Sequence, residues 1–235
     1  MRLHHLTRRN VASNLKDMTQ TLNTPRVRSV LDRLFEGAAH DDETEQAIGD
    51  VTFDPADARQ RANAFQDLYM PISEPAGRLL YVLARAARPA TVVEFGTSFG
   101  ISTLHLAAAV ADNGTGHVLT TELSPVKIAA AQANLADAGL ADAVTILPGD
   151  AMRTLASVPG PIDLLFLDGW KDLCLPVLRL LEPRLSPGAL VVADDALGHP
   201  NLAGYLAYVR DPAHGYVTLT FPVEDGMEIS CLTDA

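Results

Sequence analysis

Three aspartates and one lysine are the side chains in this sequence that are best placed to do chemistry together. Asp168 ends one strongly apolar run, and the pair Asp194 and Asp195 ends another. Such runs are typical of buried parallel strands, and open α/β sheets bind their ligands at the carboxyl ends of these strands. Carboxylate oxygens are the ligands that hard divalent cations prefer, and Lys171 lies three residues beyond Asp168. The pattern predicts a cation site beside a base, with helix N-capping by Asp168 and Asp195 as the alternative.

A glycine turn before the first of these runs predicts a second half of the site. The segment from Glu94 to Ser102 follows an apolar strand and opens a helix, with glycine at positions 96 and 100. Gly96 and Gly100 would let the backbone approach a ligand, and the helix N-terminus with Ser102 can receive an anionic group. Ser98 stands where a nicotinamide-type turn would need its second glycine.

Two further strand ends complete a predicted nucleoside pocket. Glu122 ends the next strand, where a carboxylate can accept both hydroxyls of a ribose. Gly149, Asp150 and Ala151 follow the third strand. Taken together, the three strand ends favour nucleoside binding over the alternative, which is a plain tight turn and a solvated glutamate.

The elements that position these residues alternate along the chain from residue 74 onward. The apolar pattern predicts strands at residues 91–94, 117–122, 144–147, 162–167 and 189–193, with helices at 101–110, 125–138, 152–156, 171–181 and 202–209. This alternation predicts a parallel sheet with helices on both faces, a Rossmann-like α/β fold. Two last strands, at 216–221 and 227–232, predict an antiparallel hairpin at one sheet edge.

The N-terminal part differs in composition from the rest. Residues 1–24 are polar and are expected to be flexible, and residues 25–70 form a helical segment that covers the main domain or pairs with a second subunit. Within that segment we expect a helix from Pro25, a charged loop at 39–50, and a second helix from Pro55, capped by Asp54, towards Tyr69. Residues 71–235 form the main domain.

The composition limits the classes of binding partner that are expected. The 235 residues are 48% hydrophobic and carry a formal charge of −11, which disfavours nucleic acid phosphates and anionic membranes. Cys174 and Cys231 are too few for a disulfide framework, so both are predicted to be reduced thiols. Reduced thiols are typical of the cytoplasm, which is the expected compartment. No run approaches the roughly 20 apolar residues of a membrane span.

From about Met70 to Leu232 the sequence resembles the divalent-metal-dependent O-methyltransferases that use S-adenosylmethionine, the catechol and caffeoyl-coenzyme A types. The most specific part is the stretch from Phe166 to Pro176, which contains Asp168, Gly169, Trp170 and Lys171. The resemblance implies a class I methyltransferase fold with a seven-stranded sheet. It implies that the cofactor contacts Met70, Ile72, Ser73, Glu94, Gly96, Ser98, Gly100, Ser102, Glu122, Leu123, Gly149, Asp150, Ala151 and Asp168. It also implies that Asp168, Asp194 and Asp195 bind the metal, while Lys171 and Asp168 are catalytic.

Two positions depart from the resembled family. Asp195 stands where the family commonly has asparagine, so the metal site carries an additional negative charge. Mg²⁺ is the expected ion, and Mn²⁺ or Ca²⁺ would also suit these oxygen ligands. Gly169 stands where the catechol enzyme has histidine, so catechol itself is not implied as the acceptor.

The implied activity is methyl transfer to a hydroxyl of a small vicinal-dihydroxy acceptor. The family resemblance also implies a homodimer. Two alternatives remain open at this point. One is methylation of an RNA nucleoside on the same scaffold, which the acidic charge disfavours. The other is a non-catalytic protein that binds a nucleotide, which the presence of Lys171 and the acid set disfavours.

Overall fold

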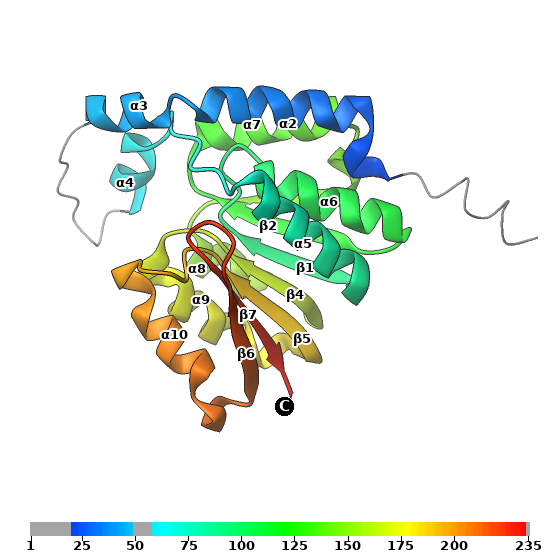
Figure 1. Cartoon of the computed structure of the whole chain (residues 1–235), viewed down its shortest axis with the longest axis vertical. Helices are drawn as coiled ribbons and strands as arrows, with labels where there is room; N and C mark the ends of the chain where they lie inside the picture. Colours follow the sequence, from blue (N-terminus) through cyan, green and yellow to red (C-terminus); the bar gives the residue numbers. More distant parts are fainter. Residues whose placement is uncertain (1–19, 49–57, 234–235) are drawn as a thin grey trace, which may run out of the picture.

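The computed structural model describes residues 20–48 and 58–233, and its centre is one seven-stranded sheet (Figure 1). The strand order is β3-β2-β1-β4-β5-β7-β6. Five strands are parallel: β1 (Thr91–Phe95), β2 (His117–Glu122), β3 (Val144–Pro148), β4 (Ile162–Leu167) and β5 (Leu185–Ala193). The hairpin of β6 (Tyr216–Phe221) and β7 (Met227–Leu232) adds antiparallel to β5. The carboxyl ends of β1 to β5 therefore meet at one edge.

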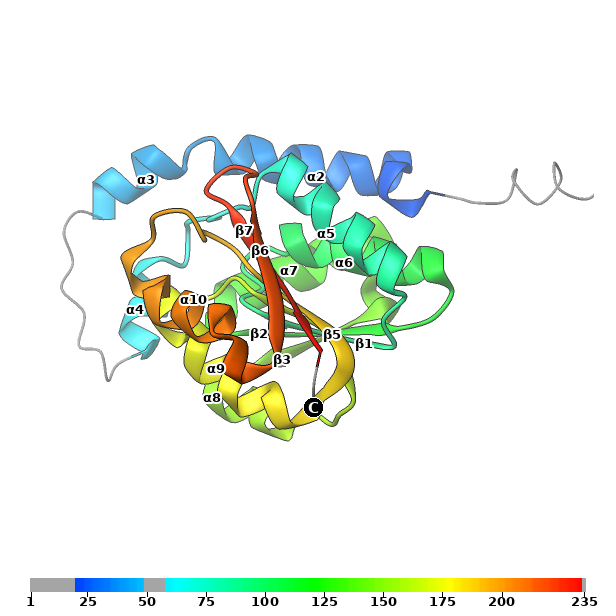
Figure 2. The same cartoon turned by 60° about the horizontal axis from the view of Figure 1, so that its bottom comes forward.

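Helices cover both faces of the sheet (Figure 2). One face packs on α5 (Glu74–Ala87), α6 (Ile101–Asn113) and α7 (Pro125–Ala138), with α2 (Pro25–Ala38) outside them. The other face packs on α8 (Ala151–Thr154), α9 (Cys174–Leu181) and α10 (Ala203–Arg210). The central strands are therefore apolar on both sides, and Leu164, Leu165 and Phe166 of β4 are fully buried.

The predicted elements of the main domain are confirmed with shifted ends. Strand β5 begins at Leu185 rather than at residue 189, and the predicted helix at 171–181 is the short turn η4 (Lys171–Leu173) followed by α9. Cys174 is a free thiol buried in that helix, as the apolar pattern predicts. Among the described residues, no helix is long and apolar enough to cross a membrane.

One prediction for the N-terminal segment is wrong. Part of the expected loop at 39–50 is a helix, α3 (Asp41–Ile48), which buries none of its residues. Its first turn carries Asp41, Asp42 and Glu43, and acidic side chains stabilise a helix N-terminus through the helix dipole. The charge that suggested a loop is thus compatible with a surface helix. The second helix, α4 (Ala58–Ala64), ends before the predicted end near Tyr69, and its predicted start at Pro55 and cap at Asp54 lie outside the described residues.

Helix α2 anchors this segment on the main domain. Thr24 caps its N-terminus, and Val27, Val30 and Leu31 are buried in the same core as α5 and α6. The Arg26 side chain donates to backbone carbonyls at the end of α7. The chain that continues from α2 through α3 and α4 then reaches the edge where the parallel strands end.

Candidate functional site

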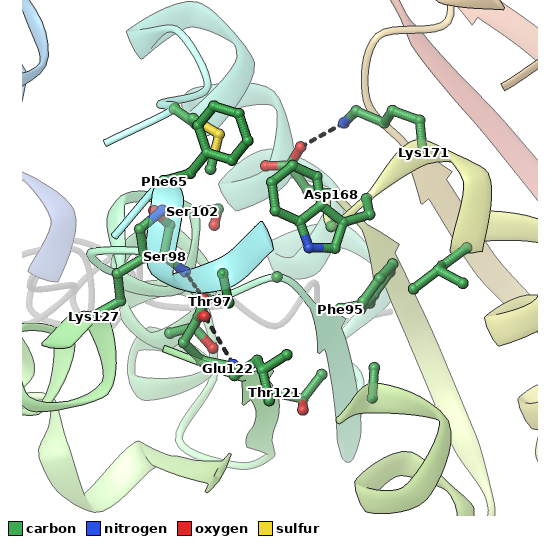
Figure 3. Close-up of a pocket in the computed structure, with 18 of the residues that line it drawn as sticks. Phe65, Phe95, Thr97, Ser98, Ser102, Thr121, Glu122, Lys127, Asp168 and Lys171 are labelled. Atoms are coloured by element: carbon green, nitrogen blue, oxygen red, sulfur yellow. Dashed lines mark hydrogen bonds and ion pairs between the residues drawn. The ribbon is translucent and has the colours of Figure 1, made fainter. Parts of the chain in front are cut away.

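A cavity of about 560 Å³ lies at the carboxyl ends of the parallel strands (Figure 3). Its wall combines the glycine turn after β1, the end of β2 at Glu122, the turn after β3, and the acidic residues after β4 and β5. Helix α4 and the segment around Met70 close it from the N-terminal side. A volume of this size lies within the range of small-molecule and cofactor sites.

The glycine turn lies close to the end of β4. Gly96 has φ 103°, and a Cβ there would lie 2.7 Å from the Asp168 carbonyl oxygen and the Gly169 nitrogen. Gly100, at φ 93°, is the N-cap residue of α6. Ser98 also has a positive φ, 46°, and its hydroxyl donates to the Tyr69 carbonyl. The turn is therefore held against both the acidic cluster and the N-terminal segment.

Glu94 lies beneath this turn and does not line the cavity. Its side chain is fully buried, and Oε2 accepts hydrogen bonds from Thr103 (2.5 Å) and Thr120 (2.6 Å). Within the described part of the chain, Oε1 has no hydrogen-bond partner. Burial raises the pKa of Glu94 to about 7, despite these hydrogen bonds. Glu94 therefore supports the turn from below, and its predicted cofactor contact stays a prediction.

Glu122 ends β2 with its carboxylate turned towards backbone donors. Oε2 accepts from the Ser98 nitrogen at 2.9 Å, and Oε1 accepts from the nitrogens of Leu123 (2.8 Å) and Ser124 (2.9 Å). These bonds join the β2 end to the glycine turn and orient the side chain, which also lines the cavity. Acceptance of ribose hydroxyls by Glu122 stays a prediction, and carboxylate lone pairs remain for it.

Most of the other predicted cofactor residues line the cavity too. The structure places Met70, Ile72, Gly96, Ser98, Ser102, Leu123, Gly149, Asp150, Ala151 and Asp168 in its wall. Two predicted residues besides Glu94 do not line it: Ser73 caps α5 and Gly100 caps α6. Asp150 also caps α8, because its side chain accepts from the Met152 nitrogen at 2.8 Å.

The acidic residues meet around Lys171. Its Nζ lies 2.9 Å from Asp168 Oδ1 and 3.0 Å from Asp195 Oδ2, and its side chain is 10% exposed. Burial raises the pKa of Asp168, and burial together with the Asp168 charge raises the pKa of Asp194 to about 8. Burial alone would lower the pKa of Lys171, but Asp168 and Asp195 raise it above its usual range. Lys171 is therefore an ammonium that neutralises part of an acidic cluster.

The alternative of helix N-capping is wrong for both aspartates. Turn η4 has Trp170 as its N-cap residue and η6 (Pro200–Leu202) has His199, in each case without a side-chain cap hydrogen bond. Asp168 and Asp195 bind the lysine instead. Asp195 has a positive φ of 61°, which turns its carboxylate from the end of β5 back towards Lys171.

The donor chemistry of this cluster fits a hard divalent cation. Two carboxylates, those of Asp168 and Asp195, share a single ammonium, which stands between them as a cation would. Burial is the largest cause of the raised pKa values of Asp168 and Asp194, and positive charge nearby lowers both values. In residues 20–48 and 58–233, no three acidic, histidine or cysteine side chains lie close enough together to hold an ion as they stand. The predicted metal ligands Asp168, Asp194 and Asp195 therefore stay a prediction.

Phe95 explains why residue 169 is glycine in this chain. A Cβ on Gly169 would overlap three atoms of the Phe95 ring. Phe95 is 5% exposed and packs among the buried residues of β4 and β5. The histidine that the catechol enzyme has at this position could not fit beside this ring without a rearrangement.

Sequence reasoning missed three cavity residues that carry distinct interactions. Arg61 of α4 places its guanidinium 3.7 Å from the centre of the Trp170 ring and 3.1 Å from Asp172. Phe65 also packs on Trp170, with ring centroids 5.7 Å apart. Lys127, on the first turn of α7, reaches the cavity from the β2 side. Each depends on a contact between distant segments, and nothing in the local sequence signals it.

The topology is the Rossmann-like fold of class I methyltransferases, and the cavity lies at the carboxyl ends of its parallel strands. A protein-family model described as a methyltransferase domain matches residues 93–196. The structure resembles that of a Podospora anserina methyltransferase solved with bound S-adenosylhomocysteine, with a TM-score of 0.64. That likeness covers 99% of this chain and all of the other at 20% identity, so it supports the fold alone.

Proteins related in sequence show which methyltransferase family the chain resembles. Catechol O-methyltransferase from Sus scrofa is 30% identical over 148 residues, which cover 60% of this chain and 78% of that protein. The Mycobacterium tuberculosis catechol O-methyltransferase is 34% identical over 127 residues, or 54% of this chain and 57% of that protein. The protein belongs to the S-adenosylmethionine-dependent O-methyltransferase family. The chain nevertheless spans little more than half the length of its mouse and mycobacterial relatives, 55% and 57%.

Proposed function

We propose that this protein transfers a methyl group from S-adenosylmethionine to a hydroxyl of a small, catechol-like acceptor. The observation that carries the proposal is a single cavity whose wall combines the glycine turn and Glu122 with the Asp168 and Lys171 cluster. A methyl donor and an acceptor can therefore be held side by side. The relatives named catechol O-methyltransferase support this acceptor class.

The acidic cluster has the chemistry that a phenolic acceptor needs. A phenol with a pKa near 10 is a poor nucleophile at neutral pH, so methyl transfer requires the phenolate or something close to it. We propose that Asp168, Asp194 and Asp195 hold a divalent cation, most suitably Mg²⁺. When bound, this cation supplies the positive charge that stabilises the phenolate and orients two adjacent oxygens.

Lys171 is proposed to accept the hydroxyl proton at Nζ. In its present pairing it keeps its own proton, because Asp168 and Asp195 stabilise the ammonium. Lys171 can act as a base only when those carboxylates are neutralised by another charge. This dependence predicts that proton removal and cation binding at the aspartates are coupled.

The test is a methyl-transfer assay with labelled S-adenosylmethionine over a panel of vicinal-dihydroxy aromatics, with bulk tRNA as a parallel substrate. We expect label in the aromatics, loss of activity with a chelator, and recovery on addition of Mg²⁺. Activity that survives chelation would mean that the three aspartates do not hold a required ion. Label in the tRNA alone would favour RNA methylation instead.

A matched variant tests the lysine. We expect Lys171→Met to lower turnover by at least about 100-fold, a typical general-base contribution, while cofactor affinity changes little. Isothermal titration with S-adenosylhomocysteine checks that affinity. Undiminished turnover at saturating acceptor would remove Lys171 from the mechanism. A homodimeric state and a cytoplasmic location stay predictions.

A further inference from the structure

The side chain of Lys127 is a buried cation in the wall of the proposed cofactor pocket. It belongs to the first turn of α7, which Ser124 caps, and only 3% of the residue is exposed. Its Nζ lies 5.8 Å from the centre of the Phe99 ring in the glycine turn. Figure 3 shows Lys127 on the side of the cavity opposite Asp168 and Lys171. Lys127 therefore faces the cofactor half of the site rather than the acidic cluster.

Lys127 differs from the other cations of the cavity because it has no ionic partner within the described residues. Lys171 pairs with two aspartates and Arg61 pairs with Asp172. The Lys127 ammonium makes no hydrogen bond or ion pair with any part of residues 20–48 and 58–233. Burial lowers its pKa, and the more distant charges of Glu122, Asp41 and Asp67 only partly oppose this. A buried, unpaired ammonium is destabilising, so its presence indicates an anionic partner that is not part of this chain.

The chemistry of the cofactor identifies that partner. S-adenosylmethionine carries one carboxylate, at the end of its methionine part, and this group must leave water when the cofactor enters the cavity. The glycine turn beside Lys127 offers the α6 N-terminus, and Ser102 there is buried in the cavity wall. Helix N-termini favour anions, and a charge-assisted hydrogen bond from an ammonium adds to that preference.

We propose that Lys127 binds the carboxylate of the methionine part of the cofactor. The proposal rests on the function proposed above, because it requires S-adenosylmethionine as the ligand. It assigns a cation that has no ionic partner among the described residues to the single anionic group of the ligand. It also explains why an acidic protein keeps a lysine at a buried position.

The experiment compares two ligands that differ only in this carboxylate, S-adenosylmethionine and its decarboxylated form, by isothermal titration. We expect the wild type to bind S-adenosylmethionine at least about tenfold more tightly, the usual effect of one charge-assisted hydrogen bond. Lys127→Met keeps most of the length of the side chain and removes its charge. In this variant we expect the preference between the two ligands to disappear, with the decarboxylated ligand bound as well as by the wild type. Lys127→Arg should keep most of the preference.

A folding control accompanies the titrations. Lys127→Met removes a desolvated charge, so the ligand-free variant should melt at or above the temperature of the wild type, while its stabilisation by S-adenosylmethionine falls. An equal loss of affinity for both ligands would show that Lys127 only shapes the pocket, for example by attracting Asp41 and Asp67. An unchanged preference in Lys127→Met would also overturn the inference. A wild type that binds neither ligand would instead refute the proposed function.

Discussion

Replacing Glu94 by glutamine should make the stability of this protein less dependent on pH. Glu94 is fully buried, and one of its two oxygens has no partner among the described residues. Burial raises its pKa from the usual 4.5 to about 7. A glutamine side chain at this position would keep an oxygen for the hydroxyls of Thr103 and Thr120 and would stay neutral at every pH. The substitution Glu94→Gln therefore isolates the ionisation of one group.

The size of the effect follows from the difference between the pKa values in the folded and unfolded states. Because the folded-state pKa is the higher one, the folded protein retains a proton that the unfolded chain has lost between pH 4.5 and 7. The contribution to stability is fully present below about pH 4.5 and is lost as the pH rises to 7. A gap of about 2.5 units, at 1.36 kcal/mol per unit, makes the total loss about 3 kcal/mol.

Urea denaturation of wild type and Glu94→Gln at pH 5 and pH 8 measures this directly. We expect the unfolding free energy of the variant minus that of the wild type to be about 2.5 kcal/mol larger at pH 8 than at pH 5. Asp168 and Asp194 also have raised pKa values, but both titrate in the two proteins. Their contribution cancels apart from the coupling between Asp168 and Glu94, which is a minor cause of the raised Glu94 pKa. The reasoning is refuted if the difference in unfolding free energy between the two proteins is the same at both pH values, within about 0.5 kcal/mol.

Two further predictions concern the walls of the cavity. Gly169→His should lower the unfolding free energy, measured by urea denaturation, by about 1 to 3 kcal/mol, because its Cβ would overlap the Phe95 ring. The double variant with Phe95→Leu should recover part of this loss. Full stability of Gly169→His alone would contradict the packing argument. Arg61→Ala should shift the fluorescence of Trp170, the single tryptophan of the chain, to longer wavelength, because the indole loses its guanidinium cover. Asp172→Asn keeps that stacking and is the control, and identical spectra for Arg61→Ala and the wild type would refute the contact.

The parallel strands and their acidic ends could be predicted from the sequence because their signals are local. Burial on both faces makes β4 a continuous apolar run, and Asp168 ends the run. Asp194 ends β5 in the same way. Helix α3 was missed because Ala47 and Ile48 are its only apolar residues, and two adjacent apolar residues give no helical period to detect.

The interactions that decide the chemistry of the site could not be predicted in this way. The pairing of Lys171 with Asp195 joins the ends of two strands, and Asp195 has a positive φ there. The contact of Arg61 with Trp170 joins segments more than a hundred residues apart. Each contact depends on which distant segments the fold brings together, and local sequence patterns do not predict this.

The sequence by itself determined the alternation of strands and helices and the presence of acidic residues at the strand ends. These follow from burial and periodicity, which act over a few residues at a time. Only the tertiary structure decided the charge state of the site, because pKa values depend on burial and on charges brought in from other elements. The tertiary structure pairs Lys171 with two aspartates, and it buries Lys127 without an ionic partner among the described residues.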